Sequence, residues 1–167
     1  MKEESSAFNL EGCEKVPEFS SCAFTGHRSL GRDFDREKLK RTIRERILDG
    51  VKVFYCGMAV GFDLAAAECV VELKSEFPSV VLVACIPCIG QEKFFGERDK
   101  RRYERLVGAA DVKVILSDKY YSGCMLRRNE YMEEKADILI CYCRKSTGGT
   151  AFTVELFKRK NKKIFSV

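Results

Sequence analysis

Hydrophobic and polar positions follow two different periods that alternate along the chain. Short runs rich in β-branched and apolar residues predict six strands, at residues 21–25, 51–56, 79–86, 112–116, 137–142 and 163–167. Several of these runs are apolar almost throughout, which is typical of strands covered on both faces of a sheet. The pattern therefore predicts that several of these strands are buried on both faces.

The segments between these runs have helical spacing. In residues 35–50, Leu39, Ile43 and Ile47 recur at intervals of four, and Gly50 follows as a typical helix end. The other predicted helical segments are 61–78, 97–109, 122–135 and 150–160. This alternation predicts an α/β fold, a single Rossmann-like, doubly wound and mostly parallel sheet of about six strands with helices on both faces.

Length and composition fit one folded domain. At 167 residues, 46% hydrophobic and 33% charged, the chain is long enough for one domain with a core and too short for two. We expect residues 1–19 to be a loosely ordered N-terminal extension and residues 20–167 to be the domain. No apolar run approaches the roughly 20 residues that span a bilayer, and the N-terminus lacks the apolar region of a secretory signal. We expect a cytoplasmic protein with no membrane partner.

The charge balance is mildly basic, with 30 basic and 25 acidic residues and a net charge of +5. Basic clusters at 98–102 and 158–160 lie on predicted helices, and we interpret them as solvated helix faces. No nucleic-acid-binding motif accompanies them, so we do not expect a nucleic-acid partner. Anionic small molecules remain compatible with this composition.

Nine cysteines are present, an odd number that excludes a complete disulfide framework. Five of them lie inside the apolar runs, where reduced cysteine behaves as a small hydrophobe: Cys22, Cys56, Cys85, Cys141 and Cys143. Cys85 and Cys88 have CxxC spacing, but a second pair for zinc is missing and the motif closes a strand instead of opening a helix. We interpret the cysteines as structural, with redox and metal roles as the alternatives, and we expect no metal and no cofactor.

Candidate chemistry lies in the turns that follow the strands, because ligands of a doubly wound sheet bind beyond the carboxyl ends of its strands. The first such turn contains Thr25, Gly26, His27 and Arg28, and His27 is the single histidine of the chain. Glycine lets a ligand approach the backbone, and the other three side chains supply hydrogen-bond donors. We predict that all four face a ligand. For His27, orientation of a neighbouring group is the alternative to a catalytic role.

The turn after the second strand, residues 56–63, has two glycines that open an alanine-rich helix. Backbone amides between such glycines resemble a phosphate cradle, although neither a Walker loop nor a GxGxxG motif is present. The alternative is a turn that simply packs the helix tightly. We predict ligand contacts for Gly57, Met58, Gly61 and Asp63.

Polar residues follow the third strand and lie on the fourth predicted helix. Gln91 comes directly after a turn and is predicted to form a pocket edge. Arg128 and Asn129 form a polar pair among the apolar positions Met125 and Met132. We interpret the two methionines as core residues and the polar pair as part of a binding site.

The turn after the fifth strand is rich in glycine and hydroxyl side chains. Gly148, Gly149 and Thr150 lie at the start of a predicted helix, whose first-turn amides are free to bind an anion. Glu155 follows about a turn and a half into that helix, where we expect it to face the same ligand. The alternative is a flexible turn with Glu155 on the surface.

Taken in order, TGHR, GMAVGFDLAAAE, IPCIGQEKFF, RNEYM and GGT resemble the YpsA-like branch of the SLOG superfamily, from about residue 20 to the C-terminus. The resemblance implies a Rossmann-like fold that binds a nucleotide or a nucleotide-derived ligand. It also extends to the LOG-type enzymes, which hydrolyse the N-glycosidic bond of nucleoside 5′-monophosphates and form homodimers.

Two segments carry the similarity to LOG-type enzymes. Residues 125–132 resemble their Met-x-x-Arg-x-x-x-Met helix, which implies a catalytic role for Arg128, and residues 147–155 resemble their Gly-Gly motif, which implies one for Glu155. Within that motif this chain has Thr147 for proline, Ala151 for the third glycine and Phe152 for threonine. These departures favour a sensor or regulatory module, with phosphoribohydrolase activity as the alternative.

Overall fold

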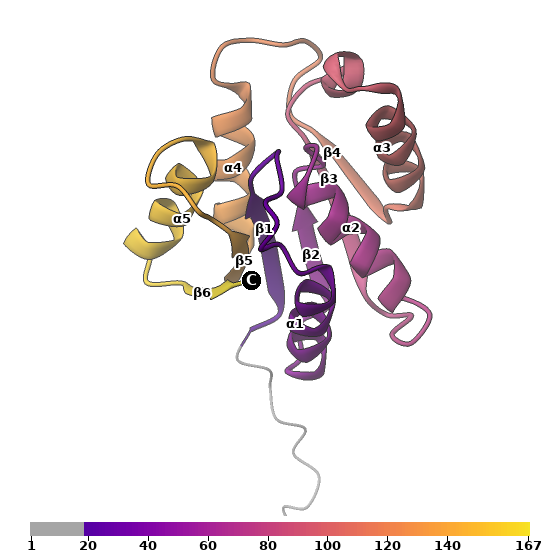
Figure 1. The fold of residues 1–167 in the computed structure, drawn as a ribbon, viewed down its shortest axis with the longest axis vertical. Helices are drawn as coiled ribbons and strands as arrows, with labels where there is room; N and C mark the ends of the chain where they lie inside the picture. Colours follow the sequence, from indigo (N-terminus) through magenta and orange to yellow (C-terminus); the bar gives the residue numbers. More distant parts are fainter. Residues whose placement is uncertain (1–18) are drawn as a thin grey trace, which may run out of the picture.

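The computed structural model describes residues 19–167 (Figure 1), so the predicted extension 1–19 lies, apart from its last residue, outside the described residues. The strands of this part of the chain are β1 (Ser21–Gly26), β2 (Val53–Cys56), β3 (Val81–Ile86), β4 (Val112–Ile115), β5 (Ile138–Tyr142) and β6 (Lys163–Ser166). The helices are α1 (Arg36–Leu48), α2 (Phe62–Leu73), α3 (Glu97–Ala109), α4 (Cys124–Lys135) and α5 (Gly149–Arg159), with a short 3₁₀ helix η1 (Gln91–Phe94). Each predicted strand and helix is present. The pattern did not predict η1.

The strands form one sheet in the order β4-β3-β2-β1-β5-β6, and every pairing is parallel. Helices α1, α2 and α3 pack next to one another on one face, and α4 and α5 pack on the other (Figure 1). The predicted doubly wound α/β sheet is therefore confirmed, and its strands are parallel throughout.

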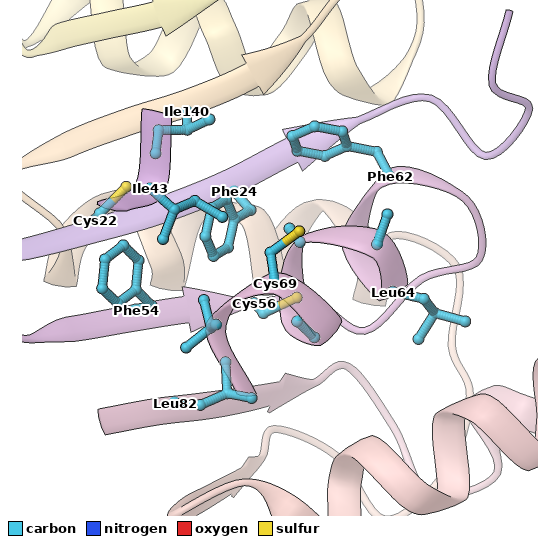
Figure 2. Close-up of a cluster of buried hydrophobic side chains, with 14 of the residues drawn as sticks. Cys22, Phe24, Ile43, Phe54, Cys56, Phe62, Leu64, Cys69, Leu82 and Ile140 are labelled. Atoms are coloured by element: carbon cyan, nitrogen blue, oxygen red, sulfur yellow. The ribbon is translucent and has the colours of Figure 1, made fainter. Parts of the chain in front are cut away.

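Aromatic and small side chains form the core between the sheet and α1–α3. Phe24 and Phe54 stack on neighbouring strands with ring centroids 5.7 Å apart, and Phe62 from α2 meets Phe24 edge to face at 6.4 Å (Figure 2). A smaller cluster under α4 and α5 includes Leu139 and Phe157. Buried rings of this size contribute strongly to the hydrophobic stabilisation of the fold.

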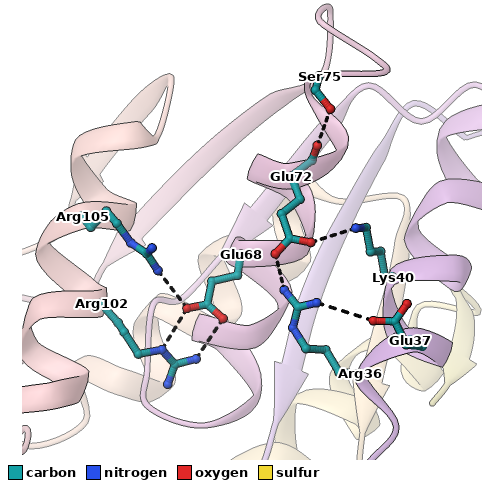
Figure 3. A network of polar contacts seen from close by, with 8 residues as sticks. All are labelled: Arg36, Glu37, Lys40, Glu68, Glu72, Ser75, Arg102 and Arg105. Carbon is teal, nitrogen blue, oxygen red and sulfur yellow. Dashed lines mark hydrogen bonds and ion pairs between the residues drawn. The ribbon is translucent and has the colours of Figure 1, made fainter.

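Ion pairs connect the three helices of the first face. On α2, Glu72 binds Arg36 and Lys40 of α1, while Glu68 binds Arg102 and Arg105 of α3 (Figure 3). These side chains are partly exposed, and exposed pairs contribute little stability individually. The basic residues of α3 thus lie on a helix surface where acidic side chains largely balance their charge.

Cysteines are mostly buried in this structure. All eight within residues 19–167 are free thiols, seven of them buried and Cys143 partly so; Cys13 lies outside the described residues. Burial raises the pKa of the Cys69 thiol to about 11 and that of Cys85 to about 12. No three His, Cys, Asp or Glu side chains of this region are placed to share a metal ion, and none of its helices is long and apolar enough to cross a membrane.

The topology places a crevice beside β1. From β1 the chain moves through α1 to β2 on one side, and after β4 it returns to β5 on the other. The loops that follow these strands diverge at this point, which is where open α/β sheets bind ligands. The turns singled out by the sequence all lie at this edge.

Candidate functional site

A cleft of about 280 Å³ lies at the carboxyl end of β1, between the starts of α2 and α5 and one face of α4. Its lining residues are Phe24, Thr25, Gly26, His27, Arg28, Ala59, Asp63, Met125, Leu126, Arg128, Asn129, Met132, Gly149 and Thr150. The sequence predicted site residues in five segments, and four of them supply lining residues to the cleft: the turns after β1, β2 and β5, and helix α4. The cleft thus joins segments that are more than 120 residues apart in the sequence.

Arg128 lies in this cleft and is 5% exposed. Its Nη1 donates to the carbonyl oxygens of Gly57 and, at 3.4 Å, of Cys85, while Nε donates to Asn129 Oδ1 at 2.9 Å. These bonds fix the guanidinium plane, yet no carboxylate within residues 19–167 lies within ion-pair distance of it. A buried cation without an ion-pair partner is unfavourable, so the cleft is electrostatically suited to an anion.

Asp63 is the carboxyl group of the cleft lining. It lies in the first turn of α2, is 6% exposed, and its Oδ2 accepts a hydrogen bond from the Ala59 N–H at 3.3 Å. Burial raises the pKa of Asp63 to about 6, while the charges of Arg128 and Arg28 and the Ala59 N–H act in the opposite direction. The pKa of Asp63 therefore lies well above the ordinary value of 3.8, and perturbed pKa values of this kind are typical of functional carboxyl groups.

The loop from Gly57 to Gly61 positions its neighbours. The Gly57 carbonyl accepts from Arg128, and a Cβ at Gly57 would lie 2.6 Å from the guanidinium. Gly61 has φ +81°, and a side chain there would overlap the carbonyl oxygen of Arg28. The Phe62 N–H donates to the His27 carbonyl at 3.1 Å. These glycines thus allow the β1 and β2 turns to approach each other closely.

His27 holds the turn after β5 in place. Its Nε2 accepts a hydrogen bond from the Arg144 N–H at 2.7 Å, and its ring meets Tyr142 edge to face with centroids 5.7 Å apart. Burial, followed by the charges of Lys145 and Arg144, lowers the pKa of His27 below its usual value. The imidazole is therefore neutral at physiological pH, as an acceptor must be. This geometry supports the orienting role.

The start of α5 offers backbone donors to the cleft. Gly148 precedes the helix with φ +96°, no side chain caps the first turn, and Gly149 and Thr150 line the cleft. Glu155 does not line it. Its side chain is 55% exposed and pairs with Lys158 at 3.3 Å.

A second cavity of about 770 Å³ adjoins the cleft between η1 and the turn that precedes α4. Arg28 and Met125 line both cavities. Gln91 lies in the wall of the second one, where its Nε2 donates to the Gly57 carbonyl at 3.0 Å. Its buried Oε1 has no hydrogen-bond partner within the described part of the chain.

The structure thus gathers most of the predicted residues. Thr25, Gly26, His27, Arg28, Asp63, Arg128, Asn129, Gly149 and Thr150 line the cleft, and Gln91 lines the second cavity. Gly57, Met58, Gly61, Gly148 and Glu155 do not line the cleft. Both methionines that the sequence placed in the core, Met125 and Met132, also line the cleft, although Met132 is itself buried. Their helical positions, three before and four after Arg128, were the available signal, because residues three or four apart share a helix face.

The chain matches a model of the YpsA family, described as the YspA SLOG family, over residues 25–166. It is 28% identical to a UPF0398 protein of Halalkalibacterium halodurans over 137 residues, 80% of this chain and 72% of that protein. It is 30% identical to UPF0398 proteins of Bacillus thuringiensis and Bacillus cereus over 128 residues, 75% of this chain and 70% of each relative.

Two solved structures share the fold. DNA processing protein A (DprA) from Streptococcus pneumoniae aligns with a TM-score of 0.62 at 17% identity, covering 89% of this chain and 50% of that one. DprA from Helicobacter pylori aligns with a TM-score of 0.64 at 18% identity, covering 88% and 64%. The chain therefore spans less than two thirds of either structure, and the likeness is one of fold.

Proposed function

Because the chain belongs to the YpsA family of SLOG proteins, we propose that its cleft binds the phosphate of a nucleotide or nucleotide-derived ligand, and that the protein acts as a sensor or regulatory module. The family membership confirms the resemblance of the sequence motifs.

The buried guanidinium of Arg128 is the observation that carries this proposal. Its hydrogen bonds to two carbonyls and one amide orient it, and Asp63, which lines the same cleft, is not in ion-pair contact with it within residues 19–167. A phosphate in the cleft would contact the guanidinium directly and could accept bidentate hydrogen bonds from it. Arg28 and the uncapped first turn of α5 would add donors from two further sides.

The placement of Glu155 favours sensing over turnover. The resemblance to LOG-type enzymes assigns the catalytic carboxylate to this residue, but no glutamate lines the cleft in the described chain. Glu155 faces solvent and pairs with Lys158. A cleft that binds the ligand without this carboxylate suits a protein whose output passes through a partner.

Thermal unfolding with nucleoside mono-, di- and triphosphates tests the proposal. A ligand at about 100 times its Kd stabilises the protein by about 2.7 kcal/mol, which corresponds to a rise in Tm of roughly 5–10 °C for a domain of this size. Arg128→Met should lose this rise relative to its own ligand-free Tm. The matched control is Arg127→Met, since Arg127 is exposed and pairs with Glu130 and Glu134.

The proposal fails if no nucleotide raises the Tm of the wild type. It fails equally if the two arginine variants respond to nucleotide in the same way, because the cleft would then not be the binding site.

One observation favours a second candidate, the phosphoribohydrolase. Asp63 places a buried carboxyl group with a pKa of about 6 in the cleft, and such a group can stabilise an oxocarbenium-like transition state or activate water. Water would cleave the N-glycosidic bond to give free base and ribose 5-phosphate. Chromatography of a panel of nucleoside 5′-monophosphates tests this. Base release that is lost in Asp63→Asn and kept in Glu155→Gln would support it, and no release would refute it.

A further inference from the structure

The second cavity is larger than the cleft and opens beside it. Its volume of about 770 Å³ lies within the range of about 300–1,000 Å³ typical of small-molecule sites, whereas the cleft at about 280 Å³ lies just below that range. Because Arg28 and Met125 line both, one extended molecule can reach from the cleft into the second cavity.

Large apolar side chains stand exposed around this second cavity. Phe94 on η1 is 95% exposed, Tyr120 is 67% exposed, and Ile89 is 56% exposed, and all three line it. Packing of the core does not account for them, since the neighbouring Phe95 turns inward and packs on Tyr103 with ring centroids 5.5 Å apart. Clustered exposed apolar groups at a cavity indicate a binding surface.

The charges of the cavity favour an anionic molecule. Arg28, Lys93 and Lys119 line it together with a single carboxylate, Asp118. None of these four side chains forms an ion pair within residues 19–167. Aromatic surface beside unpaired cations is the chemistry that recognises a base attached to a phosphorylated sugar.

We propose that this second cavity holds the base of the ligand, stacked on Phe94 and Tyr120, while the phosphate lies in the cleft against Arg128. This rests on the proposed function, because it divides one ligand between the two cavities. Phe94 and Tyr120 are then the residues that distinguish a nucleotide from its sugar phosphate.

Calorimetric titration of the full chain with the four common nucleoside 5′-monophosphates and with ribose 5-phosphate tests the division. At least one nucleotide should bind about tenfold or more tightly than ribose 5-phosphate, because stacking of a base on an aromatic side chain contributes affinity of that order. Phe94→Ala and Tyr120→Ala should each reduce that nucleotide's affinity by about fivefold or more and leave the affinity for ribose 5-phosphate unchanged.

The matched control is Tyr121→Ala, because Tyr121 is 45% exposed next to Tyr120 but does not line the cavity. It should bind both compounds as the wild type does. The high exposure of Phe94 and Tyr120 means that their truncation leaves the fold intact, which circular dichroism checks.

Equal affinity for ribose 5-phosphate and every nucleotide, or an equal loss of both in Phe94→Ala, overturns the base assignment while leaving phosphate binding intact. If neither ribose 5-phosphate nor any nucleotide binds, nucleoside di- and triphosphates included, the proposed function itself fails. Phe94-dependent binding of a single-stranded oligonucleotide without binding of any mononucleotide would overturn the assignment in favour of a nucleic-acid surface.

Discussion

Substitution of Asp63 by asparagine removes a titrating group from the cleft at nearly constant shape. The carboxyl has a pKa of about 6 in the folded protein, against an ordinary value of 3.8 that represents the unfolded chain. Between these two pH values, the folded protein therefore binds the Asp63 proton more strongly than the unfolded chain does. The stability that Asp63 contributes to the wild type is present at low pH and is lost as the pH rises towards 6.

The magnitude follows from the size of the shift. A difference of about two pH units, at about 1.4 kcal/mol per unit, gives roughly 3 kcal/mol between the fully protonated and fully ionised limits. Between about pH 4.5 and pH 8 the expected change is roughly 2 kcal/mol, because part of the titration lies below that range. Asp63→Asn should thus gain stability relative to the wild type by that amount as the pH is raised.

Urea unfolding of both proteins at several pH values measures this difference directly, and every other titrating group cancels in the comparison. Asp118→Asn is the control, because Asp118 is an exposed carboxylate of the second cavity. A stability difference between Asp63→Asn and the wild type that does not change with pH would refute the account of a buried, proton-binding carboxyl.

Further predictions concern the loops and the ligand. Gly61→Ala should destabilise the protein by about 1–3 kcal/mol in urea unfolding, because φ +81° and the Arg28 carbonyl both disfavour a side chain; an unchanged stability would contradict this. Gly57→Ala should abolish the nucleotide-induced rise in Tm by displacing the Arg128 guanidinium, and a retained rise would contradict that geometry. His27→Ala should destabilise the fold by about 1 kcal/mol at neutral pH through loss of the Arg144 bond. Because the pKa of His27 is lowered, its contribution is full above its ordinary value and is lost as the pH falls, so the difference should shrink in acid. Around pH 6, nucleotide binding should take up more protons in the wild type than in Asp63→Asn, since a phosphate beside Asp63 raises the pKa of that group further while the titration of the ligand is common to both proteins; titration in buffers of different ionisation enthalpy measures the difference, and equal values would contradict it.

The fold was predictable because strands buried on both faces are apolar along their length in the sequence. The run 137–142 is apolar throughout its central part, and β5 is buried at every position. The location of the cleft was also predictable, because parallel topology brings all carboxyl ends to one edge of the sheet. Residues as distant as Thr25 and Thr150 meet there for this reason.

Side-chain direction within that edge was harder to predict. On α5, Thr150, Thr153, Val154 and Phe157 are buried, and this spacing places Glu155 on the opposite, solvent-exposed face. The helical period of α5 was therefore the signal that Glu155 points away from the cleft. The carboxyl group that lines the cleft belongs to Asp63 instead. No hydrophobic period in the sequence indicated the second cavity. Phe94 lies on a 3₁₀ helix and Tyr120 in the loop before α4, and the conformations of both segments depend on tertiary contacts.

Direct calorimetric titration of a stabilising nucleotide into wild type, Arg128→Met and Arg127→Met tests whether the buried arginine of the cleft binds the phosphate. Charge-assisted hydrogen bonds of this kind contribute about 1.5–3 kcal/mol, so Arg128→Met should weaken binding by at least about tenfold while Arg127→Met binds as the wild type does. Undiminished affinity in Arg128→Met would show that Arg128 does not bind the phosphate.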